Sequence, residues 1–151
     1  MEKQMAKAAE SMSLAEVYAF AIEREREAQA FYSESLKFTK DPGARAMLGD
    51  LYQQEIGHER MLMEAQNRGQ FNAIGKPRGY QDLGLADQLP KIELGPKSTI
   101  QEILIAAIKK EALAEAFYAA AAKNAKDDNA VRLFTQLAAE EHGHKTQLET
   151  W

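Results

Sequence analysis

An internal duplication constrains this chain more than any other feature of its sequence. When the sequence is shifted by 86 residues against itself, residues 14–62 align without a gap with residues 100–148, and 17 of the 49 pairs are identical. The matches include a Phe-Tyr pair and a Glu-x-x-His motif, which two unrelated helices of ordinary composition do not share. We therefore expect two copies of one structural unit.

Each copy has the pattern of a helical hairpin. Helical periodicity of the apolar residues is interrupted once in each half, at residues 40–43 and at residues 126–129. Ser13 with Glu16, and Thr99 with Glu102, form capping-box signatures at the expected starts of the hairpins. The sequence predicts helices over residues 13–40, 43–68, 99–126 and 129–150.

The long segment between the hairpins, residues 69–98, predicts the topology. It contains five of the nine glycines and three of the four prolines, so we expect a crossover without regular structure. Breaks of about four residues favour antiparallel helices within each hairpin. A crossover of this length can travel back along a helix of about 37 Å, which makes the second and third helices parallel. The prediction is a single all-α domain over residues 1–151, a four-helix bundle of two duplicated antiparallel hairpins joined by one long crossover.

Each predicted helix turns one glutamate toward the bundle core. In the second helix, Leu51, Glu55, His58 and Leu62 are spaced as the inward stripe of a bundle helix, and the fourth helix repeats this spacing. The first and third helices place a single glutamate among inward apolar residues. The candidate metal ligands are Glu25, Glu55, His58, Glu111, Glu141 and His144.

Four buried carboxylates need compensating positive charge, because each ionised group loses several kcal/mol of hydration on burial. We expect the basic residues Arg24, Arg26, Lys109 and Lys110 to lie on other faces of the helices. Two divalent cations would balance four carboxylates, and imidazole nitrogens would complete the ligand set. The sequence therefore predicts two metal ions in the bundle core.

The combination resembles the rubrerythrin-like branch of the ferritin-like superfamily. The resemblance rests on Ile22-Glu-Arg-Glu25-x-x-Ala28-x-x-Phe31-Tyr32, on its copy ending in Phe117-Tyr118, and on the two Glu-x-x-His motifs. It implies a ferritin-like bundle with a di-iron carboxylate site. By resemblance, Glu25 and Glu111 would be terminal ligands, Glu55 and Glu141 would bridge the metals, and His58 and His144 would each bind one metal. Tyr32 and Tyr118 would hydrogen-bond to the carboxylates.

The resemblance also implies an activity, the reduction of hydrogen peroxide or dioxygen at a non-haem di-iron site. The chain has no cysteine and thus no rubredoxin-type iron centre, so we expect a separate electron donor such as a rubredoxin-like protein. Many rubrerythrins place a further glutamate three residues after the third-helix ligand, where this chain has Ala114. Iron is the expected metal, with manganese or a mixed iron/zinc pair as alternatives, and a homodimer is the expected assembly.

Two other functions fit the same residues. One is a ferroxidase or iron-handling role, and the other is a structural or regulatory bundle whose metals are zinc or absent. The sequence alone does not choose among them.

Charge and hydropathy exclude other classes of protein. A net charge of -4 argues against nucleic acid as a partner, and no uncharged apolar run approaches the roughly 18 residues needed to span a membrane. No signal-peptide pattern precedes Ser13, and we expect a cytoplasmic protein. We expect His142 and the off-stripe glutamates on solvated faces; the latter are Glu23, Glu27, Glu59 and Glu140.

Overall fold

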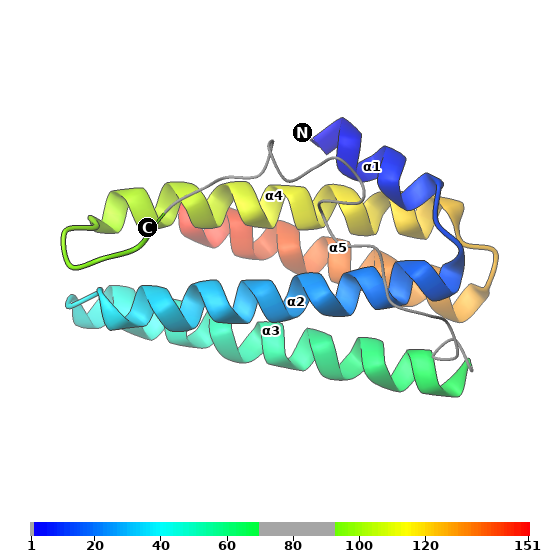
Figure 1. The fold of residues 1–151 in the computed structure, drawn as a ribbon, viewed down its shortest axis with the longest axis horizontal. Coiled ribbons are helices and arrows are strands. Elements are labelled where there is room, and N and C mark those ends of the chain that lie inside the picture. Colours follow the sequence, from blue (N-terminus) through cyan, green and yellow to red (C-terminus); the bar gives the residue numbers. More distant parts are fainter. Residues whose placement is uncertain (1, 70–92) are drawn as a thin grey trace.

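The computed structural model describes residues 2–69 and 93–151, and within these ranges all regular structure is helical (Figure 1). The helices are α1 (Glu2–Glu10), α2 (Leu14–Lys37), α3 (Pro42–Arg68), α4 (Ile100–Asn124) and α5 (Asp128–Glu149). The all-α prediction is confirmed for this part of the chain. None of the helices described there is both long and apolar enough to cross a membrane. Most of the predicted crossover, residues 70–92, lies outside the described residues.

The N-terminal caps of the four long helices are alike in the two hairpins, as the duplication of the sequence leads one to expect. Ser13 and Thr99 each make a full capping box, with Glu16 and Glu102 respectively, as predicted. The side chains of Asp41 and Asp127 accept hydrogen bonds from backbone amides and cap α3 and α5. The observed helix boundaries lie within three residues of the predicted ones.

The two hairpins lie side by side in the bundle (Figure 1). Helix α2 packs mainly against α3, and α4 packs mainly against α5, while the contacts between the hairpins are fewer. The helices of each hairpin are antiparallel, and α3 and α4 run in the same direction along the bundle (Figure 1). The predicted topology, two antiparallel hairpins whose second and third long helices are parallel, is therefore confirmed for the described residues.

Helix α1 was not among the predicted helices. The expectation of four helices was therefore wrong, because the described residues contain five. It packs against the outside of α4 (Figure 1). Met5, Ala8 and Ala9 form its narrow apolar face, and the Met5 side chain is fully buried. Isolated helices this short are marginal in water, so α1 depends on the apolar area that it buries against α4.

Apolar side chains form two clusters, one toward each end of the bundle. The first cluster includes Phe117 and Phe134, and the second includes Leu48, Leu51 and Ile103. In each of α2, α3, α4 and α5 the inward glutamate lies between the segments that enter the two clusters. The bundle core is therefore apolar at both ends and acidic at the middle.

Candidate metal centre

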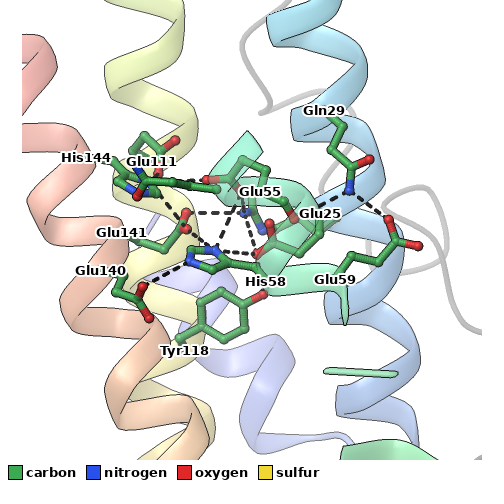
Figure 2. A network of polar contacts seen from close by, with 12 residues as sticks. Glu25, Gln29, Glu55, His58, Glu59, Glu111, Tyr118, Glu140, Glu141 and His144 are labelled. Atoms are coloured by element: carbon green, nitrogen blue, oxygen red, sulfur yellow. Dashed lines mark hydrogen bonds and ion pairs between the residues drawn. The ribbon is translucent and has the colours of Figure 1, made fainter. Parts of the chain in front are cut away.

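The six predicted ligands meet in the middle of the bundle core (Figure 2). Glu25 comes from α2, Glu111 from α4, and the two Glu-x-x-His motifs come from α3 and α5. Each residue is at most 4% exposed. The periodicity of the sequence placed these residues on inward stripes, and the stripes of all four long helices converge on one site.

The six residues form two overlapping groups that resemble metal-ligand sets. Glu25 and His58 belong to the first group, Glu111 and His144 belong to the second, and Glu55 and Glu141 belong to both. Within each group the ligand atoms all lie within 4.8 Å of one another. We call these groups the His58 half and the His144 half of the site.

Buried ligand atoms without hydrogen-bond partners show that the site fits a pair of cations. Each of the six residues has at least one buried oxygen or nitrogen that lacks such a partner, and for Glu55 this includes both carboxylate oxygens. Unsatisfied buried polar atoms are rare in folded proteins, and carboxylate oxygens with imidazole nitrogens suit divalent transition metals. The ligand set therefore matches two metal ions.

The two histidine rings lie in parallel and present the same nitrogen to the carboxylates. Their ring centroids are 5.6 Å apart, with an angle of 10° between the planes. His58 Nδ1 lies 2.8 Å from Glu141 Oε1, and His144 Nδ1 lies 3.2 Å from Glu55 Oε1. Nδ1 is thus the nitrogen that each ring would offer to a metal.

The outer nitrogens of the rings meet residues that the sequence reasoning did not single out as part of the site. His144 Nε2 is 2.5 Å from Gln54 Oε1. His58 Nε2 is 3.7 Å from Glu140 Oε1 (Figure 2). Gln54 and Glu140 are equivalent positions of the duplication, each directly before a motif glutamate. That equivalence is the feature of the sequence from which their place beside the histidines could have been predicted. Glu140 was expected on a solvated face, but it is only partly exposed, and its Oε2 is buried.

Each predicted tyrosine donates a hydrogen bond to a glutamate of the other hairpin. The Tyr32 hydroxyl donates to Glu111, and the Tyr118 hydroxyl donates to Glu25, both at 2.6 Å. Burial and the nearby carboxylates raise the pKa of both phenols well above the usual value, so both stay neutral donors. The bonds expected from the resemblance are present.

Arg24 lies against the cluster, and the prediction that it lies on another face is wrong. Its side chain is 6% exposed, and its Nη2 lies 3.5 Å from Glu25 Oε1 and 3.4 Å from Glu141 Oε2. A long arginine stem can bend back over an adjacent helix face, which helical periodicity does not capture. Arg26 does point outward and pairs with Glu59 at 2.9 Å.

The pKa values of the four glutamates divide them into two pairs. Burial tends to raise the pKa of Glu25, but close contacts with Glu55, the Arg24 guanidinium and His58 outweigh burial and lower that pKa to about 2. Burial likewise opposes the lowered pKa of Glu111, which results from contacts with His144, Glu141 and Tyr32. Burial and neighbouring carboxylates raise the pKa values of Glu55 and Glu141 well above the usual value.

His58 also has a shifted pKa. Burial disfavours its charged form, but the adjacent Glu25 carboxylate and the charges of other nearby carboxylates raise the pKa to about 9. The raised pKa values of Glu55, Glu141 and His58 favour the protonated forms of these three residues in the metal-free protein.

His142 lies outside the site, as predicted. Its side chain is 58% exposed, and Nδ1 lies 2.8 Å from Glu115 Oε2. Lys145 Nζ also contacts Glu115, at 3.2 Å. These three residues form a network at the surface that is separate from the six buried ligands.

The fold and the site together define a class: a four-helix bundle of two similar hairpins with a buried carboxylate and histidine centre able to hold metal. A family model described as Rubrerythrin matches residues 2–66 and 102–151, which is most of the chain. The chain belongs to the rubrerythrin family, and the resemblance seen in the sequence is confirmed. No curated protein and no solved structure matches the chain. Membership of this family indicates a di-iron redox protein.

Proposed function

We propose that this protein reduces hydrogen peroxide or dioxygen at a dinuclear iron site, using electrons from a separate donor. The observation that carries the proposal is the pair of overlapping groups of buried carboxylates and imidazoles with unpartnered ligand atoms. Two iron ions bound there would supply together the two electrons that convert hydrogen peroxide and two protons into two waters.

The arrangement of the groups assigns each residue a task in holding the metals. Glu55 and Glu141 belong to both halves of the site, so each would serve both ions. Glu25 and Glu111 each belong to one half and would be terminal ligands. His58 and His144 would each bind one ion through Nδ1.

Tyr118 and Tyr32 would hold the terminal carboxylates in place. Each phenol donates to Oε1 of its glutamate, and Oε2 of both glutamates is buried without a hydrogen-bond partner. The free oxygen of each carboxylate is therefore available to a metal, while the other oxygen is fixed. Outer-shell hydrogen bonds of this kind orient ligands and support metal affinity.

Ala114 bears on the choice of oxidant. It is fully buried in α4, three residues after Glu111, where many relatives are expected to carry a further glutamate. A carboxylate that could exchange onto a metal is therefore absent from this position. We therefore propose that peroxide and dioxygen be compared directly as substrates. We propose a rubredoxin-like protein as the class of electron donor.

The test loads metal-free protein anaerobically with Fe(II) and mixes it with peroxide or with dioxygen. Loss of chelatable Fe(II) and consumption of the oxidant are followed in parallel. We expect two iron ions per chain and oxidation faster than that of free Fe(II) in the same buffer. Elemental analysis of protein purified without added metal addresses the zinc alternative, because zinc alone in the site would contradict a redox role.

Matched variants connect the activity with the site. Glu55→Ala and His144→Ala should lower both iron content and oxidation rate. His142→Ala is the control, because His142 is exposed and lies outside the cluster. Wild-type protein that binds no metal, or bound iron that oxidises no faster than free iron, would refute the proposal.

A further inference from the structure

The positive charge of Arg24 is closer to one half of the site than to the other. Arg24 Nη2 lies within 3.9 Å of Glu25, Glu55 and Glu141, which are the three carboxylates of the His58 half. Two of these serve both halves, but Glu25 belongs to the His58 half alone. A metal ion bound by these three carboxylates would share them with the guanidinium, and like charges close together repel strongly in a buried site.

The duplication supplies an internal comparison for this charge. The residue equivalent to Arg24, 86 positions later, is Lys110. Its Nζ lies 5.1 Å from the centroid of the Phe31 ring, in a cation–π contact. The two halves therefore differ in charge although their six ligands match.

The histidine of the other half is held in a fixed orientation by a hydrogen bond. His144 Nε2 meets Gln54 Oε1, and Gln54 Nε2 donates to Asp50 Oδ2 at 2.6 Å, which fixes the orientation of the Gln54 amide. Because an amide oxygen only accepts, the ring proton resides on Nε2. Nδ1 is then the nitrogen that faces Glu55 and Glu111, at 3.2 and 3.5 Å.

His58 lacks such a support. Its Nε2 is 3.7 Å from Glu140 Oε1, too far for a hydrogen bond, and both His58 ring nitrogens are buried without a hydrogen-bond partner. Binding a metal in this half therefore requires the ring to be fixed at the same time. An orienting partner that is already in place favours metal binding, and losing one lowers affinity on the order of 10- to 100-fold.

From these two differences we infer that the halves of the site bind metal unequally: the His144 half fills first and more tightly, and Arg24 weakens the His58 half. The inference rests on the proposed metal binding but not on any redox reaction. Arg24 is on this view a residue that sets metal affinity without itself being a ligand. Gln54 is a positioning residue that acts through His144.

The experiment is a calorimetric titration of metal-free protein with Mn(II), an ion that suits these ligands and needs no oxidant. We expect two resolved steps, a tight one followed by a weaker one. His58→Ala should remove the weak step and retain the tight one. His144→Ala should remove the tight step and leave one ion bound weakly.

Two further variants test the cause of the difference. Arg24→Met keeps an unbranched stem but removes the guanidinium and its charge, and it should tighten the weak step on the order of tenfold or more, with a smaller effect on the tight step. Gln54→Leu should weaken the tight step on the order of 10- to 100-fold. Lys110→Met, at the position equivalent to Arg24, should leave both steps unchanged.

The outcomes separate this inference from the proposed function. Two steps of equal affinity in the wild type, or a tight step that survives in His144→Ala, would overturn the inference while metal binding stands. Absence of Mn(II) and Fe(II) uptake would overturn both. The comparison of wild type with the two histidine variants decides the order of filling even if Arg24→Met does not fold.

Discussion

Tyr118 of α4 and Glu25 of α2 are joined by a 2.6 Å hydrogen bond that crosses between the two hairpins. Both residues are at most 1% exposed, and the pKa of Glu25 is lowered to about 2, so the phenol donates to an ionised carboxylate. Tyr32 and Glu111 repeat the bond in the opposite sense. The pair of bonds links the hairpins on both sides of the proposed metals.

Removing the Tyr118 hydroxyl should destabilise the metal-free protein. A hydrogen bond to a charged buried group contributes about 1.5–3 kcal/mol, and Tyr118→Phe loses it while keeping the ring. Chemical denaturation of metal-free protein measures the change in the free energy of unfolding. Tyr52→Phe, at a partly exposed tyrosine of α3, serves as the control and should change stability by less than about 0.5 kcal/mol. Equal effects of the two substitutions would contradict the assigned role of the bond.

Metal affinity should rise with pH. Below a pH of about 9 His58 holds a proton, and burial with neighbouring carboxylates raises the pKa values of Glu55 and Glu141, which favours their protonated forms. Metal ions must displace these protons, and each proton released adds about tenfold in affinity per pH unit. Mn(II) titrations at pH 6, 7 and 8, repeated in buffers of different ionisation enthalpy, give the slope and the number of protons. An affinity independent of pH would show that the protons reside elsewhere.

Glu55→Gln should separate the stability of the fold from the binding of metal. Burial and the charges of its neighbours raise the pKa of Glu55 and so favour its neutral acid form, which an amide resembles. We expect the free energy of unfolding without metal to change by no more than about 1 kcal/mol.

With metal, the wild type and Glu55→Gln should differ. Ligand at about 100 times the dissociation constant stabilises a folded protein by about 2.7 kcal/mol, and the variant should lose most of this gain because Glu55 serves both halves of the site. Thermal unfolding with and without Mn(II) measures it. Glu59→Gln is the control on the same helix, because Glu59 pairs with Arg26 outside the ligand set. A full metal-induced shift in Glu55→Gln would contradict its role.

Met5→Ala should test the contribution of α1. Met5 is fully buried between α1 and the bundle, and truncation of a buried methionine costs about 2–5 kcal/mol. Lys3→Ala, at an exposed position of the same helix, should have little effect. Metal stoichiometry of Met5→Ala, measured below its unfolding transition, should equal that of the wild type, because α1 provides none of the ligands. A smaller loss than about 1 kcal/mol would mean that α1 is not anchored by this residue.

The helices and the ligand set were predictable because both depend on local pattern. Two kinds of signal act within one or two helical turns: the caps at Ser13 and Thr99, and the spacing of Glu55 and His58. Both can therefore be recognised in the sequence alone. The duplication then made each motif a check on the other. Convergence of the four glutamates followed from the topology, which short loops within the hairpins restrict to few choices.

The features that were missed depend on contacts between helices. Arg24 was misplaced because its backbone position lies off the core stripe while its guanidinium reaches the cluster. Gln54 could not be linked to His144 without knowing how α3 and α5 face each other. Helix α1 has only a narrow apolar face, which is defined by the surface of α4 on which it packs.

The division of the ligands between the hairpins has a mechanical consequence. Residues 14–62 contribute three of the six ligands and residues 100–148 contribute the other three, so the seam between the hairpins passes through the ligand set. Bound ions would therefore cross-link the two hairpins. If the backbone were cut between residues 69 and 93, each fragment would carry three of the six ligands. Metal binding would then bring the two fragments together.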